Sequence, residues 1–237
     1  MEFVYGEKNI GSNKNVNFFI YKIDDIEHET YKVLLDLFDM TWLNSLNDRH
    51  AINSFKSKAL KTAKKIQERI IKKSDDGELV REAGEHIVVY NALNVIEKEL
   101  NYKKIPLGES FKNRVINNGG FDYFAENLVE YGVCFGEGKY RNDGSCNSFK
   151  SALQQVLDFI KDNKDTEEYD ELMYFLDEKT KELYDDNKEY SIGFSIDGTY
   201  MNTVLPRDIF EMISKNVDFI ELEKNKRLHI IGIVFGD

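Results

Sequence analysis

Residues 132–140 read GVCFGEGKY and place a glutamate and a lysine inside a segment that otherwise resembles a strand. The apolar residues of the segment have the bulk and the β-propensity of a half-buried strand. Because side chains alternate along a strand, Glu137 and Lys139 share one face with Phe135. A glutamate or a lysine is rarely buried unless it is paired. The segment therefore predicts an acid and a base that point together from one strand.

Length and composition are those of an ordinary globular protein. The chain has 237 residues, of which 41% are hydrophobic and 32% charged, enough for one large domain or a domain with an extension. No apolar run approaches the ~20 residues that span a bilayer, and the beginning, MEFVYGEKNI, is unlike a signal peptide. We therefore expect a cytoplasmic protein without membrane contact. Cys134 and Cys146 fit neither a zinc spacing nor a disulfide framework.

The net charge of −11 is unevenly distributed along the chain. Segment 49–73 has nine basic residues and one acid, whereas segment 158–189 has thirteen acids and five lysines. An acidic protein gains little nonspecific attraction to nucleic acid, but a basic helix can still guide a strand or dock a partner. A solvated helix face is the alternative interpretation of the basic segment. The candidate DNA- or partner-binding residues are Lys58, Lys61, Lys65 and Arg69.

Hydrophobic periodicity predicts an α/β fold. Residues 76–237 are expected to form the core, with an acidic helical insertion at about 163–189, behind an N-terminal α-rich extension at 1–75 that holds one strand and the basic helix. The predicted strands are 17–23, 119–126, 132–140, 190–196 and 228–235. The predicted helices are 30–46, 53–73, 77–100, 148–162, the acidic stretch 166–186 and a short helix after Pro206.

Asp122, in the preceding predicted strand, supplies a second carboxylate for the Glu137 group. Two adjacent carboxylates favour a hard divalent cation, with Mg²⁺ the first choice and Mn²⁺ the second, and the carbonyl of Gly138 is a possible further ligand. The ammonium of Lys139 beside that ion would stabilise charge on a phosphate. The pattern predicts phosphodiester hydrolysis. A salt bridge at the rim of the sheet is the structural alternative.

Two helix residues extend this candidate site. Glu85 shares a helix face with Val88 and Ala92, so it should point toward the packed side, where a glutamate needs a partner. Two interpretations of Glu85 are open: it holds a second metal ion or a water molecule, or it is a capping or border residue of the helix. Glu82 is the substitute candidate for the role of Glu85. Gln155 either steadies the site or lies at the border of the helix. The chain has no Gly-rich loop with lysine and serine or threonine, which excludes ATP hydrolysis at a P-loop.

Asp122 followed by Glu137-x-Lys139 resembles the PD-(D/E)xK nuclease superfamily. Phe121 stands where that signature begins with proline. Gln155, with phenylalanine four residues later, is similar to the Gln-x-x-x-Tyr motif of the RecB-like branch. The resemblance implies a mixed central sheet flanked by helices, with metal held by Asp122, Glu137, Gly138 and Glu85 and with catalytic roles for Lys139 and Gln155.

The runs GELVREAGEHIVVYNALN, FGEGKY and SALQQVLDFI narrow the resemblance to the HamA family, the nuclease subunits of Hachiman anti-phage defence systems. The resemblance covers about residues 77–162 best. It implies a bacterial Mg²⁺-dependent deoxyribonuclease that forms a heterocomplex with a superfamily 2 helicase, HamB, which holds the DNA and consumes ATP. The alternative is a non-catalytic DNA- or partner-binding subunit with a structural Asp/Glu/Lys cluster.

Overall fold

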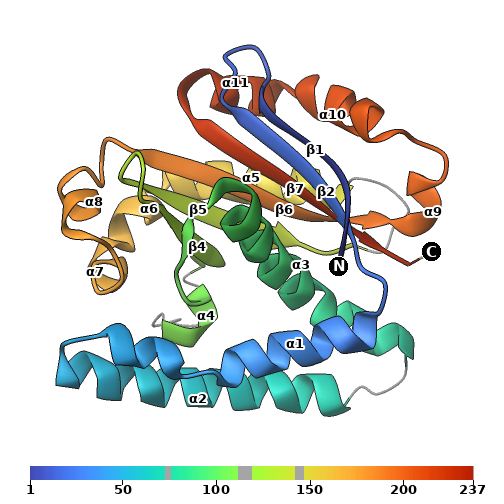
Figure 1. Cartoon of the computed structure of the whole chain (residues 1–237). Coiled ribbons are helices and arrows are strands. Elements are labelled where there is room, and N and C mark those ends of the chain that lie inside the picture. The colour runs from blue at the N-terminus through green and yellow to red at the C-terminus, as the bar shows by residue number, and fades with distance from the viewer. Residues whose placement is uncertain (73–75, 112–118, 142–146, 237) are drawn as a thin grey trace.

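The computed structural model describes residues 1–72, 76–111, 119–141 and 147–236 (Figure 1). Within these ranges a seven-stranded sheet has the strand order β1-β2-β7-β6-β5-β4-β3. The strands are β1 (Glu2–Ile10), β2 (Val16–Lys22), β3 (Lys103–Lys104), β4 (Tyr123–Asn127), β5 (Gly132–Lys139), β6 (Lys188–Asp197) and β7 (Arg227–Phe235).

The four central strands of the sheet are parallel, and its edges are antiparallel. β2, β7, β6 and β5 run in one direction, while β1, β4 and β3 pair antiparallel with their neighbours. Parallel strands are covered on both faces, which explains the nearly continuous apolar run RLHIIGIVF of β7. The predicted α/β fold with a mixed sheet flanked by helices is confirmed at this level.

Helices cover both faces of the sheet. They are α1 (Ile26–Phe38), α2 (Arg49–Lys72), α3 (Asp76–Leu100), α4 (Gly108–Phe111), α5 (Asn147–Lys161), α6 (Lys164–Glu167), α7 (Tyr169–Leu172), α8 (Glu178–Glu182), α9 (Gly198–Met201), α10 (Pro206–Ser214) and α11 (Val217–Asn225), with a 3₁₀ turn, η1, at Thr41–Ser45. Among the described helices, none has both the length and the apolar character needed to cross a membrane.

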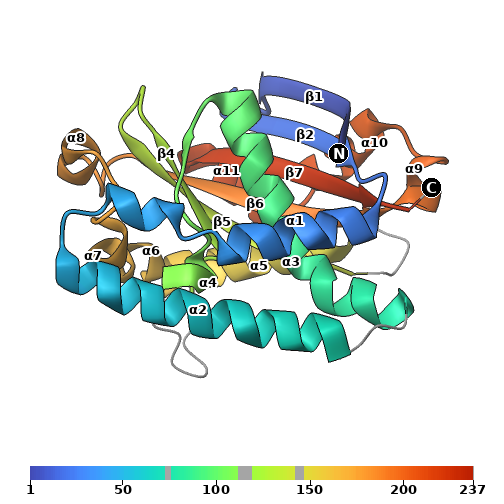
Figure 2. The same cartoon turned by 60° about the horizontal axis from the view of Figure 1, so that its bottom comes forward.

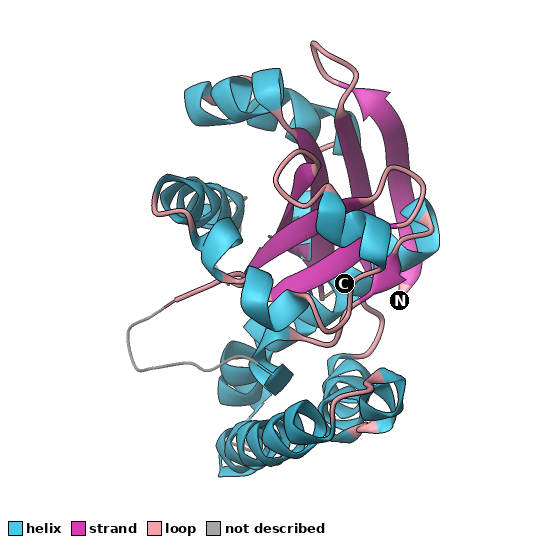
Figure 3. Cartoon of the chain, turned by 90° about the vertical axis from the view of Figure 1, so that its left-hand side faces the viewer, coloured by secondary structure: helices cyan, strands magenta, loops and turns pink. Residues whose placement is uncertain are grey.

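Two hydrophobic clusters show how the layers are arranged. α3 packs on one face together with buried residues of α1 and α2, while α5, α10 and α11 pack on the other face. Figures 1 and 2 show α3 crossing the sheet and α1 lying beside α2. Figure 3 shows the twisted sheet with helices on both sides and the α1–α2 pair at its lower end. The candidate site must therefore lie at an end or an open edge of the sheet.

The N-terminal strands are part of the central sheet rather than of a separate extension. β2 pairs in parallel with β7 over its whole length, from Val16 opposite Leu228 to Lys22 opposite Val234. The boundary predicted at residue 75 therefore does not separate an extension from the core, and only the α1–α2 segment lies outside the sheet. The segment between α5 and β6 does form the short helices α6, α7 and α8, as the acidic composition of 163–189 suggested, but its last residues begin β6.

A buried polar network joins the strands at the end where β2, β6 and β7 begin. The His229 ring is hydrogen bonded to Glu189 through Nε2 (2.8 Å) and to Asn17 through Nδ1 (3.1 Å). Glu189 also accepts hydrogen bonds from the Tyr102 hydroxyl (2.7 Å) and the Asn127 amide (2.9 Å). All five side chains are buried. Although burial raises the pKa of Glu189, the bonds from His229, Asn127 and Tyr102 outweigh it and lower that pKa to about 2.

We expect Glu189→Gln to destabilise the protein by about 3 kcal/mol at pH 7, since one pKa unit corresponds to about 1.4 kcal/mol. The folded-state pKa of Glu189 is about 2 and its ordinary value is 4.5. This contribution is therefore present above about pH 4.5 and is lost as the pH falls toward 2. Urea unfolding at several pH values should show that pH dependence in the wild type and a weaker one in the variant. Glu178→Gln, at an exposed glutamate, is the control and should change little.

Candidate functional site

The candidate site lies where β5 extends beyond β4. The pairing of the two strands begins with Tyr123 opposite Gly136, so Glu137, Gly138 and Lys139 have no partner residue in β4. Asp122 stands at this point. Its backbone N–H donates to the Gly136 carbonyl (2.8 Å), and its Oδ2 accepts the Gly138 N–H (3.1 Å). A carboxylate thus takes the place that a backbone carbonyl would occupy in a longer strand.

Two glycines of β5 allow the neighbouring side chains to come close. A Cβ on Gly138 would lie 2.5 Å from Val89 of α3, and a Cβ on Gly136 would lie 2.0 Å from the Tyr123 ring. Only glycine permits these approaches without displacing the helix or the tyrosine. Because Glu85 is one helical turn before Val89, the close packing of α3 brings Glu85 to the end of β5.

Lys139 connects two glutamates from different elements. Its Nζ lies 2.9 Å from Oε1 of Glu137 and 3.1 Å from Oε1 of Glu85. The side chain of Glu137 is 0% exposed, that of Lys139 is 22% exposed and that of Glu85 is 47% exposed. The three side chains therefore form a row from the interior of the protein to the solvent. The structure brings together Asp122, Glu137, Lys139 and Glu85, as the strand periodicity and the helix face predicted.

Glu137 is an unusually costly residue for this fold. Within the described chain neither of its carboxyl oxygens makes a well-aligned hydrogen bond, so its contacts are the ion pair with Lys139 and the neighbouring Asp122 carboxyl. Burial, and then the negative charge of Asp122, raises the pKa of Glu137 well above its ordinary range, and Lys139 offsets this only in part. Oε1 of Glu137 is thus in contact with the Lys139 ammonium, and Oε2 is the oxygen that retains capacity to bind a proton donor or a cation.

Lys139 is held in its charged form. Burial lowers its pKa, but the negative charges of Glu137, Asp122 and Glu85 together outweigh burial and raise the pKa above its ordinary value. An ammonium group with a raised pKa is a poor general base at neutral pH. The chemistry that Lys139 can supply is therefore that of a fixed positive charge.

Asp122 and Glu137 supply oxygen donors that fit a magnesium ion. No cluster of three or more histidine, cysteine or acidic side chains suited to a metal occurs among the described residues. Mg²⁺, however, is commonly bound by one or two carboxylates, with water and substrate phosphates completing its octahedron. The buried Glu137 oxygens without aligned hydrogen bonds are consistent with that mode of binding.

Gln155 is not joined to this group. It is half-buried on α5, and no hydrogen bond or ion pair between described residues connects it to Glu137, Lys139 or Glu85. The side chain of Glu82, the substitute for Glu85, lies outside the described part of the structure, as do the side chain of Arg69 and residue Cys146.

The exposed basic residues of helix α2 differ in part from the four that the sequence predicted. Lys58 is part-buried. Its Nζ donates a hydrogen bond to the Phe111 carbonyl (3.3 Å) and lies 4.0 Å from the Glu171 carboxylate. Lys61 and Lys65 are exposed, as predicted. The sequence reasoning missed two further exposed lysines on the same helix, although helical spacing from the buried stripe would have indicated them. We call the exposed set the α2 basic face: Lys56, Lys61, Lys64 and Lys65.

Comparisons with known proteins do not identify the chain, because no protein-family model, no curated protein and no solved structure matched it.

Substituting Glu137 should separate a functional from a structural role. We expect Glu137→Met to lower stability by less than the about 3–5 kcal/mol that removal of one partner of a buried ion pair typically costs, since the other partner, Lys139, is part-exposed. Lys139 would keep Glu85 as its partner. Thermal or urea unfolding without added divalent metal is the measurement.

The matched control is Glu189→Met, at another buried glutamate, which is hydrogen bonded to His229, Tyr102, Asn127 and Arg227; this variant should lose about 3–5 kcal/mol. An equally large loss in Glu137→Met would mean that the Glu137–Lys139 pair holds the fold together, and it would remove the reason for assigning the pair a function.

Proposed function

We propose that this chain is a Mg²⁺-dependent deoxyribonuclease of the PD-(D/E)xK type that hydrolyses phosphodiester bonds. The observation that carries the proposal is the buried Glu137, ion-paired to Lys139 and adjacent to Asp122 at the open end of β5. A fold gains nothing from burying a carboxyl without aligned hydrogen bonds, whereas a cation-binding site requires such a group.

Each residue of the site has a distinct role in this proposal. Mg²⁺ held by Asp122 and Glu137, with the Gly138 carbonyl as a further donor, would supply Lewis-acid stabilisation of negative charge on a phosphate. Lys139 presents a second, permanent positive charge toward the same phosphate. Glu85 is a positioning residue, because it holds the ammonium of Lys139 from the solvent side. Mn²⁺ is the second choice of metal.

The proposed setting is a bacterial defence complex in the cytoplasm, as the resemblance to the HamA family implies. A net charge of −11 repels DNA at long range, so the chain alone should find its substrate slowly. A superfamily 2 helicase similar to HamB would hold the DNA and restrain the nuclease until it is activated. The α2 basic face is the surface suited to contact either the DNA or this partner.

A second candidate function is a non-catalytic DNA- or partner-binding subunit. The hydrogen bond from the Gly138 N–H to Asp122 and the two ion pairs of Lys139 favour it, since together they would stabilise the end of β5 without chemistry. The two candidates differ in one measurable respect, namely metal-dependent cleavage.

We expect the wild-type chain, with the helicase and ATP, to degrade plasmid DNA in the presence of Mg²⁺ and not in EDTA. Lys139→Met should lower the cleavage rate about 10²–10³-fold, the typical effect of losing one positioned charge at a reacting phosphate. Lys181→Met is a matched control, because Lys181 is equally exposed (22%) and is likewise paired with a glutamate. Its rate should equal that of the wild type.

Wild-type cleavage by Lys139→Met, or no cleavage by the wild-type complex under any of these conditions, would favour the non-catalytic subunit. Unfolding curves of both variants show whether a loss of activity comes from a loss of structure.

Charge reversal should reveal the role of the α2 basic face. We expect Lys61→Glu combined with Lys65→Glu to weaken either DNA cleavage or co-purification with the helicase, because reversal turns attraction to phosphates or acids into repulsion. Lys215→Glu with Lys224→Glu, at an exposed lysine directly after α10 and an exposed lysine in α11, is the control. If both double variants behave like the wild type, the face is only solvated.

A further inference from the structure

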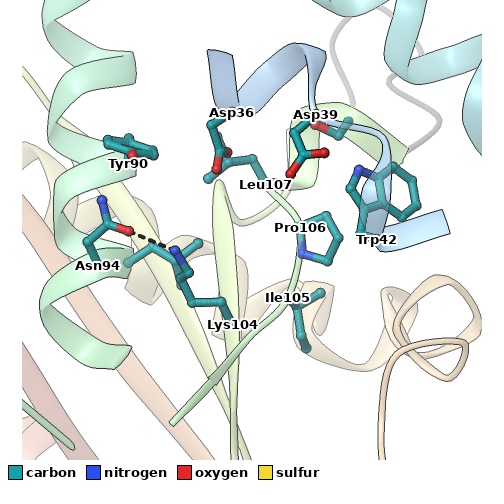
Figure 4. A pocket seen from close by; sticks show the side chains of 11 residues that line it. Asp36, Asp39, Trp42, Tyr90, Asn94, Lys104, Ile105, Pro106 and Leu107 are labelled. Carbon is teal, nitrogen blue, oxygen red and sulfur yellow. Dashed lines mark hydrogen bonds between the residues drawn. The ribbon is translucent and has the colours of Figure 1, made fainter. Parts of the chain in front are cut away.

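A pocket of about 220 Å³ lies outside the Glu137 site, between α1, η1, α3 and the segment from β3 to α4 (Figure 4). Its walls combine acids, aromatic rings and aliphatic groups. The lining residues on which the argument depends are Asp36, Asp39, Trp42, Tyr90, Lys104 and Ser110. Figure 4 shows Asp36 and Asp39 between the rings of Tyr90 and Trp42.

Asp36 is a desolvated anion without a bonded partner. It is half-buried on α1, and its carboxylate makes no hydrogen bond or ion pair with any residue in the described ranges. Burial raises its pKa, and the nearby charges of Asp39 and Glu97 act in the same direction. Lys104 opposes them from a distance, but its ammonium is already held by Asn94 (2.8 Å) and Glu97 (3.2 Å). Lys104 is the positive charge that the fold places near Asp36, but it makes no direct ion pair with the Asp36 carboxylate.

Ser110 is a second polar group without a partner in the pocket. Only 5% of this residue is exposed, and its hydroxyl makes no hydrogen bond within the described part of the chain. Because Ser110 lines the pocket, its hydroxyl is open to accept a hydrogen bond from an N–H group of a bound ligand. This observation is independent of the two acids and indicates a hydrogen-bond donor in the same space.

The walls of the pocket suit the rest of such a ligand. Trp42 is held in place by Phe55 and Phe175, with ring centroids 6.1 Å and 5.8 Å away. Aromatic faces attract ammonium and guanidinium groups and also pack against hydrocarbon. The carboxyl oxygens of Asp39 accept hydrogen bonds from the backbone N–H and the hydroxyl of Thr41. An acid, a hydroxyl group and an aromatic face are together the chemical groups that recognise an organic cation.

We propose that this pocket binds a guanidinium or alkylammonium group carried on a short hydrocarbon chain. Asp36 pairs with the charge, Asp39 adds a second negative charge, Ser110 accepts an N–H and Trp42 with Tyr90 contacts the hydrocarbon. Such a group is available from an arginine or lysine side chain of a bound protein and from a free amine. The inference does not depend on nuclease activity, since no residue of the Glu137 site lines the pocket.

Trp42 is the only tryptophan of the chain, so its fluorescence reports on the pocket directly. The test titrates the full chain with agmatine, which carries an amine and a guanidinium, at constant ionic strength, and repeats the titration by calorimetry. Agmatine should give saturable binding, whereas the neutral analogue n-butylurea should give none. Asp36→Asn should weaken binding about tenfold or more, because it removes a charge-assisted hydrogen bond. Asp158→Asn, at an exposed acid of α5, should bind like the wild type.

The proposal is overturned if neither method detects agmatine binding, if n-butylurea binds equally well, or if Asp36→Asn binds agmatine as tightly as the wild type. A parallel titration with the peptide Gly-Arg-Gly separates the two sources. Tighter binding of the peptide than of agmatine supports an arginine of a partner protein, and the reverse supports a free amine. Thermal unfolding of Asp36→Asn should match the wild type, because Asp36 has no bonded partner to lose.

Discussion

The position at which β4 begins determines the candidate site. If β4 paired with β5 along its whole length, Glu137 and Lys139 would have a neighbouring strand on each side. Instead the pairing begins at Tyr123 and Gly136, and the side-chain carboxylate of Asp122 accepts the hydrogen bond from the Gly138 N–H. Because the Asp122 carboxylate lies where a backbone carbonyl would otherwise be, a negative charge stands next to the buried Glu137 without an inserted loop.

The close approach of α3 then makes the arrangement rigid. Gly138 leaves no room for a side chain between β5 and Val89, so the helix cannot move away or slide without creating a void. Glu85 is carried by that helix and meets Lys139 at 3.1 Å. The strand fixes Glu137, the helix fixes Glu85, and Lys139 is held between two elements that cannot shift independently. Under the proposed function, a cation held in this way would need little reorganisation as a phosphate approached.

The sequence predicted the local features of this arrangement well and the long-range ones poorly. Alternation along 132–140 placed Glu137 and Lys139 on one face, because this follows from the geometry of a single element. Helical spacing brought Glu85 to the site but not to the packed side, since its side chain is 47% exposed. The pairing of β2 with β7 joins residues more than two hundred positions apart, and no local pattern encodes it. Lys58 was misjudged for the same reason, since its partners Phe111 and Glu171 lie on elements distant in sequence.

Two of the buried glutamates of the sheet, Glu137 and Glu189, differ in how their carboxyl oxygens are bonded. Glu189 is surrounded by donors, which lower its pKa to about 2 and leave its oxygens committed to His229, Tyr102 and Asn127. Glu137 is equally buried, yet its pKa is raised because burial and Asp122 both disfavour its charge. The same residue type in the same sheet therefore holds the strands together at one end and retains free binding capacity at the other. Hydrogen-bonded polar groups stabilise a fold, and under the proposed function a metal ion would complete the bonding of Glu137.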